Sequence, residues 1–115
     1  MRKRISVILS LTVALLCLTT LETFAETKPL TGKKIIVDAG HGGWDPGAVG
    51  VNGLTEKQIN LRVAQSLRNC LIEYGGASVE MTRVDDRYVS LQSRAAKANA
   101  SNADRFISVH HNGSV

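Results

Sequence analysis

Short apolar runs alternate along this chain with longer stretches in which apolar residues recur at helical spacing. Residues 35–38 open with two isoleucines and a valine, which is typical of a short buried strand. Residues 77–82 and 106–109 predict two further strands, with Val79 and Met81 on one face of the middle one. The segments between these strands have the spacing of helices.

The first predicted helix begins at Glu56 and stops at Gly75-Gly76. Thr55 and Gln58 have the spacing of a capping box, which marks a helix start. The helix dipole favours a carboxylate at this end, which is a purely structural explanation for Glu56. Its spacing from the apolar positions nevertheless places Glu56 on their face, which we expect to be buried. Those positions are Ile59, Val63, Leu67, Cys70, Leu71 and Tyr74.

The second predicted helix has Ser90 as its N-cap and continues to about Asn99. Its apolar stripe comprises Leu91, Ala95 and Ala98. The loop at 39–53 contains six glycines, a density that excludes a regular element. Loops of this length are usually functional or disordered. The tryptophan in it, Trp44, is either a substrate platform or a lid over the sheet edge.

The order strand, helix, strand, helix, strand predicts an α/β fold with a largely parallel sheet and flanking helices. All strands of a parallel sheet end at the same edge, and ligands bind at that edge. His41 follows the first strand, and the pair His110-His111 follows the third. Glu56 begins the helix that starts from the same edge. Two imidazoles and a carboxylate are therefore expected to converge there.

Two histidines and a carboxylate form a ligand set that is typical of a catalytic zinc ion with one open position. Water in that position has its pKa lowered to roughly 7. Because neighbouring strand residues point to opposite faces, one of His110 and His111 is expected to face the metal, and strand geometry leaves the choice open. Asp38 either orients His41 by accepting its free N–H or brackets the loop. The plain structural alternative is a glycine-rich turn with a surface histidine.

The first 25 residues have the pattern of a secretory signal peptide. A basic start precedes the almost wholly apolar residues 5–18, and Thr23-Phe24-Ala25 offer a small-x-small cleavage site. The apolar run is short for a membrane span, although an uncleaved anchor is the alternative. Cys17 does not indicate a lipoprotein, because Leu16 before it is not small. We expect a secreted protein in the periplasm, or outside the cell at the wall, with residues 26–32 as an exposed linker.

Charge and cysteine content narrow the function classes. The formal net charge of +4 falls to +2 without residues 1–25, and no concentrated basic run is left, so nothing indicates nucleic-acid binding. No membrane partner is expected after cleavage of the signal. Cys70 is the one cysteine outside the signal, which excludes an intrachain disulfide and predicts a domain stabilised by its core. The other 90 residues suffice for a modest core.

Several motifs form an ordered series along the chain. They are Val37-Asp38-Ala39-Gly40-His41-Gly42-Gly43, residues 53–57 with Asn60-Leu61, Thr82-Arg83, Arg94 with Ala98-Asn99, and residues 103–112. In this order and spacing they resemble the catalytic domain of zinc-dependent N-acetylmuramoyl-L-alanine amidases, which are bacterial cell-wall hydrolases. The resemblance runs from about residue 33 to the last residue. It implies one zinc ion, with His41, Glu56 and His110 as ligands, and so selects His110 over His111.

The resemblance also implies the substrate, peptidoglycan. The bond cleaved would be the amide between the lactyl group of N-acetylmuramic acid and the L-alanine of the stem peptide. Arg83 and Arg94 could hold stem-peptide carboxylates, although we favour structural pairing with Asp85 or Asp86. The candidates for contacts to the ligands or to substrate are Asp38, Arg83, Arg94, His111 and Asn112.

The sequence departs from the family pattern at a few positions. Ala39 stands where proline is common and Gly113 where alanine is usual, and neither change touches a ligand. The glutamate that serves as general base in the family would lie beyond Val115. We therefore expect residues 33–115 to be the N-terminal part of a catalytic domain. The competing hypotheses are an inactive truncated chain, a non-catalytic zinc- or wall-binding fragment, and a different zinc hydrolase such as a deacetylase.

Overall fold

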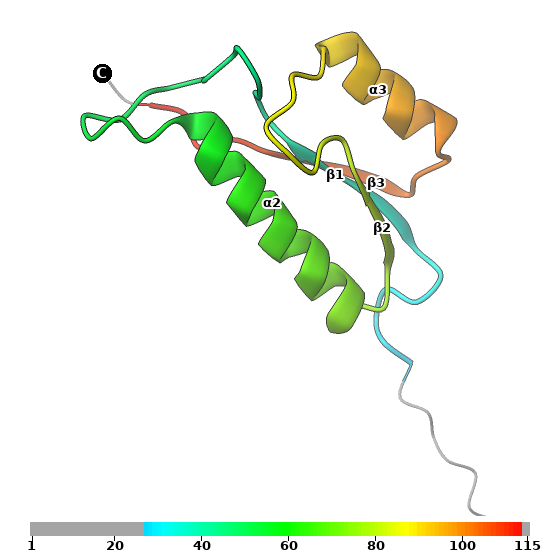
Figure 1. Cartoon of the computed structure of the whole chain (residues 1–115). Helices are drawn as coiled ribbons and strands as arrows, with labels where there is room; N and C mark the ends of the chain where they lie inside the picture. The colour runs from blue at the N-terminus through cyan, green and yellow to red at the C-terminus, as the bar shows by residue number, and fades with distance from the viewer. Residues whose placement is uncertain (1–26, 114–115) are drawn as a thin grey trace, which may run out of the picture.

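The structure is a computed structural model that describes residues 27–113, and it contains a three-stranded parallel sheet between two helices (Figure 1). In chain order the elements are β1 (Lys34–Ala39), α2 (Glu56–Glu73), β2 (Ser78–Met81), α3 (Leu91–Ala100) and β3 (Arg105–Val109). The strand order is β2-β1-β3, and both pairs are parallel. The predicted α/β fold class is therefore confirmed, with β1 as the central strand.

The predicted signal peptide, residues 1–25, lies outside the described residues and stays a prediction. Among the helices of residues 27–113, none combines the length and the apolar character needed to cross a bilayer. The segment expected to be an exposed linker is mostly exposed, but Leu30 packs against the core. The backbone N–H of Leu30 also donates to the Gly75 carbonyl at 2.8 Å. This part of the segment therefore belongs to the folded domain.

Strand β1 carries the core, because its residues are buried on both faces of the sheet. Ile35, Val37 and Ala39 belong to the core cluster on the α2 side, where Ala64 meets them. Ile36 alternates with them and is fully buried on the opposite face. The partly buried residues that complete the core are Leu30, Leu61, Leu67, Leu71, Val79, Ile107 and Val109.

Helix α2 begins at Glu56 as predicted, and Leu67 and Leu71 of the predicted apolar stripe pack against the core, whereas other stripe positions do not. The buried residues are Glu56, Asn60 and Ala64, which are spaced four apart and so share one face. This row of most deeply buried residues is not marked by hydrophobicity, because it carries a carboxylate, an amide and a small methyl group. The predicted stripe positions that are exposed instead are Val63, Cys70 and Tyr74.

Helix α3 begins after Ser90, whose hydroxyl accepts the Ser93 N–H at 3.1 Å, as expected of an N-cap. Its predicted apolar stripe is largely open: Leu91 is 77% exposed and Ala95 is also exposed. The buried residue of α3 is Arg94. A polar contact therefore holds this helix to the sheet, where an apolar stripe was expected.

That contact is a buried ion pair between Arg94 and Asp38 of β1, with Nη1 2.5 Å from Oδ1. Asp38 also accepts hydrogen bonds from the hydroxyls of Thr82 and Ser108, so it links β1 to β3 and to the end of β2. Burial raises the pKa of Asp38, but the hydrogen bonds from Thr82, Ser108 and Arg94 outweigh this and hold the pKa below its ordinary value. Asp38 is therefore an anion that joins the strands to α3.

Replacing Arg94 by methionine should lower the free energy of unfolding by about 3–5 kcal/mol, because Asp38 would be left buried without its cation. Urea unfolding followed by circular dichroism measures the loss. The matched control is Arg87→Met, since Arg87 pairs with Asp85 at the surface, where both side chains are more than half exposed. This control should change stability little. Equal losses in the two variants would contradict the prediction.

Candidate metal centre

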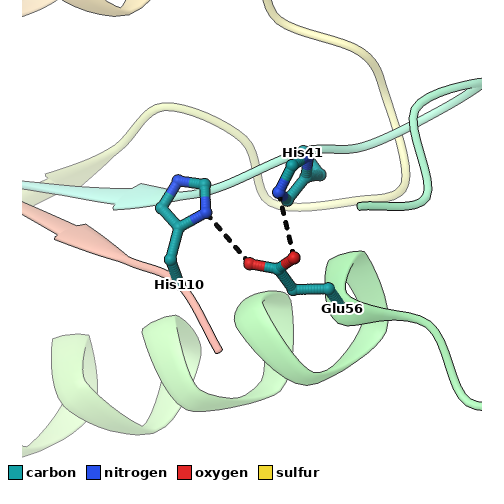
Figure 2. A group of neighbouring side chains, drawn as sticks. All are labelled: His41, Glu56 and His110. Carbon is teal, nitrogen blue, oxygen red and sulfur yellow. Dashed lines mark hydrogen bonds and ion pairs between the residues drawn. The ribbon is translucent and has the colours of Figure 1, made fainter. Parts of the chain in front are cut away.

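Three side chains meet at the C-terminal edge of the sheet: His41, Glu56 and His110 (Figure 2). Each offers one ligand atom, and these atoms all lie within 4.8 Å of one another. His41 stands just after β1, His110 directly follows β3, and Glu56 is the first residue of α2. Of the residues that the topology placed at this edge, the structure thus brings together His41, Glu56 and His110 as a group that could hold a metal ion.

The pairing of β1 with β3 sets the approach of the two histidines. Ala39 is paired with Val109, and the Gly40 N–H donates to the Val109 carbonyl at 3.1 Å. A Cβ atom at Gly40 would overlap the ring of His110. The rings of His41 and His110 meet edge to face, with centroids 4.9 Å apart. Glycine at position 40 is therefore what lets the His110 imidazole lie against the end of β1.

The loop between β1 and α2 brings His41 to Glu56. His41 has a positive φ of 60°, which is uncommon for a residue with a side chain. Gly47 lies so close that an added Cβ would be 2.5 Å from the His41 ring and 2.7 Å from Glu56 Oε2. At the helix start, Gln58 Oε1 accepts the Thr55 N–H at 3.1 Å, as the predicted capping box requires. Close backbone approach and a defined helix start together position Glu56.

The imidazole of His41 lies between two carboxylates. Its Nδ1 is 2.8 Å from Asp45 Oδ2, and its Nε2 is 3.2 Å from Glu56 Oε2. A neutral imidazole donates from one nitrogen only. When Nδ1–H donates to Asp45, the Nε2 lone pair faces Glu56, and a cation shared by the two residues satisfies both.

Asp45 therefore does what was predicted for Asp38, and the prediction that Asp38 accepts the free N–H of His41 is wrong. The Asp38 carboxylate is turned to Arg94, Thr82 and Ser108 instead. Sequence reasoning passed over Asp45. The available signal was its position four residues after His41 within the glycine-rich loop.

Glu56 is a buried carboxylate with hydrogen-bond donors on both oxygens. Oε2 accepts the backbone N–H of Ala48 at 2.9 Å, and Oε1 accepts that of His111 at 3.1 Å. His110 Nδ1 lies 3.0 Å from Oε1. Burial raises the pKa of Glu56, but the hydrogen bonds from Ala48, His111 and His110 outweigh it and lower the pKa to about 2. At neutral pH the three side chains therefore include a fixed anion.

His111 lies beside the cluster with its ring turned to Asn60, whose Oδ1 is 2.8 Å from His111 Nδ1. Asn60 is fully buried, and its Nδ2 donates to the Gly40 carbonyl at 3.2 Å and to Glu56 Oε1 at 3.4 Å. Asn60 thus connects His111, β1 and Glu56, a role that sequence reasoning missed. The signal for it was a polar side chain one helical turn after Glu56.

Arg83 and Arg94 act inside the fold, so the structural role that we favoured is confirmed, but their partners are not the predicted carboxylates of Asp85 and Asp86. Arg83 is 2% exposed, and burial lowers the pKa of its guanidinium somewhat. Its guanidinium donates to four backbone carbonyls, those of Ala39, Gly40, Lys57 and Asp85. The expected carboxylate partners pair with other cations, Asp85 with Arg87 and Asp86 with Lys57. The hydrogen bonds of both guanidinium groups go to backbone carbonyls and, for Arg94, also to Asp38.

An open cleft of about 660 Å³ leads to His41 and His110. Its lining also includes Asp45, Tyr88 and the exposed apolar residue Leu91. A smaller hollow of about 270 Å³ lies next to Glu56. His111 and Asn112 line this hollow. The candidate metal centre is thus reached from solvent through a cleft large enough for a substrate group.

Comparison with known proteins gives a consistent result. The N-acetylmuramoyl-L-alanine amidase family matches residues 35–115. The protein YqiI of Bacillus subtilis is 45% identical over 106 residues, which are 92% of this chain and 50% of YqiI. The sporulation-specific N-acetylmuramoyl-L-alanine amidase of Bacillus subtilis is 51% identical over 80 residues, which are 69% of this chain and 31% of that protein. The chain thus spans half or less of the length of these relatives.

Solved structures agree with this. The N-acetylmuramoyl-L-alanine amidase from Clostridium difficile 630 superposes with a TM-score of 0.68 at 38% identity, over 71% of this chain and 45% of that one. The catalytic domain of CwlV from Bacillus (Paenibacillus) polymyxa var. colistinus gives a TM-score of 0.68 at 37% identity, over 71% and 46%. The fold at the candidate metal centre is therefore the fold of part of these domains.

The substitution Glu56→Gln should make the stability of the metal-free protein less dependent on acid pH. The pKa of Glu56 is lowered in the folded state from an ordinary value of about 4.3 to about 2. Ionised Glu56 therefore contributes stability above the unfolded pKa, and this contribution is lost as the pH falls through about 2. Urea unfolding in chelator between pH 5 and pH 2 measures the slope.

The variant should unfold at lower urea at pH 5, and its stability should fall less steeply towards pH 2 than that of the wild type. Glu73→Gln, at the exposed end of the same helix, controls for the loss of one negative charge. Parallel curves for wild type and Glu56→Gln would show that Glu56 is not a strongly stabilised anion.

Proposed function

Because this chain belongs to the N-acetylmuramoyl-L-alanine amidase family, we propose that it takes part in peptidoglycan hydrolysis. The bond cleaved is the amide between N-acetylmuramic acid and the L-alanine of the stem peptide. The observation that carries this proposal is the cluster of His41, Glu56 and His110 at the end of an open cleft. The proposed location is the cell envelope or the exterior, where this substrate is found.

The donor set of the cluster fits one zinc ion. Zinc binds imidazole nitrogen and carboxylate oxygen at about 2.0–2.1 Å in a tetrahedron, which places neighbouring ligand atoms about 3.3 Å apart. His41 Nε2 lies 3.2 Å from Glu56 Oε2, and His110 Nδ1 lies 3.0 Å from Oε1, the other oxygen of the same carboxylate. One ligand atom from each of the three residues lies within 4.8 Å of the others. Two neutral imidazoles and one carboxylate leave a fourth position open.

When bound, a zinc ion supplies Lewis-acid polarisation of the substrate carbonyl and lowers the pKa of water. The residues of the chain hold and orient it. Asp45 accepts from His41 Nδ1 and so keeps Nε2 free as a ligand. The backbone N–H groups of Ala48 and His111 hold the Glu56 carboxylate in place. The site is thereby preorganised for a cation before a substrate arrives.

Proton transfer to the leaving amine needs a further group. Two other carboxylates line the cleft, and both are engaged: Asp38 by Arg94, and Asp45 by His41. We therefore keep the proposal that the general base is a glutamate outside the described residues. The substrate contacts of Asn112 and His111 are likewise proposals, supported by their place in the hollow next to Glu56.

The decisive experiment digests purified sacculi with the full-length protein, including the glutamate that we propose as general base, and labels new amino termini. We expect N-terminal alanine to be released and one zinc ion to be bound per chain, and His41→Ala should abolish both. Cys70→Ser is the matched control, because Cys70 is an exposed thiol about 21 Å along α2 from Glu56. Release of acetate would indicate a deacetylase instead. Bound zinc without any hydrolysis would indicate a non-catalytic binding protein.

Asp45→Asn should weaken zinc binding about 10- to 100-fold, because an amide in place of the carboxylate no longer fixes the His41 tautomer. Competition with a chromophoric chelator measures the affinity. The control is Asp85→Asn, which removes a surface carboxylate that pairs with Arg87. Unchanged zinc affinity in Asp45→Asn would remove Asp45 from the metal site.

A further inference from the structure

Trp44 and Tyr88 form an aromatic pair at the surface, next to the candidate metal centre. Their ring centroids are 4.4 Å apart, and the ring planes are tilted by 33°. Trp44 is 75% exposed and Tyr88 is 42% exposed, so most of the indole surface is open to solvent. Tryptophan is highly buried on average, and aromatic side chains left at a surface are typical of binding sites.

The backbone in front of Trp44 is firmly held. Gly43 packs against Tyr88 so closely that a Cβ atom added to Gly43 would lie 2.8 Å from the backbone nitrogen of Tyr88. The Gly43 N–H donates to Asp86 Oδ1 at 3.2 Å, and its carbonyl accepts from Lys57 Nζ at 2.7 Å. Lys57 and Asp86 in turn pair at 2.6 Å. The backbone next to Trp44 is thus attached to α2 and to the loop after β2, and the indole itself contacts Tyr88 of that loop, which lowers the ordering cost of binding.

The pair is continuous with the cleft. Tyr88 lines the same cleft as His41 and His110. Trp44 is followed directly by Asp45, whose carboxylate binds His41. Two residues of chain, Gly42 and Gly43, separate Trp44 from His41, so their Cα atoms lie within about 11 Å. A group bound on the indole would therefore stand close to the candidate metal ligands.

The surroundings of the pair indicate what kind of group it binds. The nearby charges are already matched, Asp86 by Lys57 and Asp85 by Arg87. The described residues around the indole therefore offer a flat apolar face without a spare cation for a carboxylate. A pyranose ring matches such a face, because its C–H groups can cover the aromatic ring while its hydroxyl groups stay in water. The acidic stem peptide is the poorer match.

We propose that Trp44, supported by Tyr88, is a platform on which one N-acetylhexosamine ring of the glycan strand stacks. This rests on the proposed function, which brings the glycan to the cleft. The platform is a positioning device: it holds the sugar so that the adjoining lactyl amide reaches His41 and His110. It contacts no reacting atom, so its loss weakens substrate binding and leaves the chemical step intact.

The binding test uses the indole itself, because Trp44 is the only tryptophan in the 115 residues. Titration with the N-acetylglucosamine trimer in chelator should change the tryptophan emission saturably, and this readout needs neither zinc nor hydrolysis. Calorimetry with the same trimer should show that Trp44→Ala binds at least 5-fold more weakly and that Trp44→Phe stays within about 2-fold of wild type. Tyr74→Ala, which removes an exposed aromatic side chain at the C-cap of α2, is the control.

The kinetic test uses sacculi. Trp44→Ala should raise KM about 5- to 10-fold, which is the usual contribution of one aromatic contact, with kcat within about 2-fold. Trimer binding through Trp44 without any hydrolysis would support the platform and overturn the proposed function. Hydrolysis with no emission change and an unaltered KM in Trp44→Ala would overturn the platform and leave the proposed function standing.

Discussion

The parallel pairing of β1 with β3 is the constraint on which the candidate metal centre depends. It places Ala39 opposite Val109, so the chain emerges from both strands at the same level of the same edge. His41 and His110 then lie side by side, since Gly40 leaves room for the second ring. A shift of the β1–β3 register by one residue would turn the side chains of β3, and His110 after it, to the opposite face and separate His110 from His41. The approach of His41 and His110 therefore depends on the register of β1 and β3.

Buried polar groups stabilise the C-terminal edge of the sheet, because a small domain has few apolar side chains with which to cover it. Arg83 satisfies carbonyls at the end of β1, and Arg94 neutralises Asp38 beneath them. Each guanidinium offers five donors in a rigid plane, which suits a strand end where several carbonyls point inward. The same edge thus contains one set of charged residues that holds the backbone and another, around Glu56, that can receive a cation.

The glycine-rich loop between β1 and α2 supports both the candidate metal centre and the aromatic pair of Trp44 and Tyr88. Gly47 allows His41 and Glu56 to approach each other, and Gly43 packs against Tyr88 with Trp44 beside it. Through these contacts the loop connects the candidate metal ligands to the aromatic pair, although it contains no helix or strand. A loop of this length needs such fixed contacts if it is to position a site.

The sequence alone determined the elements, their parallel order and the meeting of His41 and Glu56 with the pair His110-His111, because periodicity and topology are local or follow from general rules of chain connection. The choice of His110 within that pair came from the family resemblance. The tertiary structure decided what depends on side-chain direction. It chose Asp45 over Asp38 as the partner of His41 and turned both arginines inward. It also placed Asn60 on the buried face of α2 and laid Trp44 on Tyr88. Spacing offered a weak signal for Asp45 and Asn60 and none for the contacts of Arg83 and Arg94 with residues 38–40, which lie more than 40 positions away in the chain.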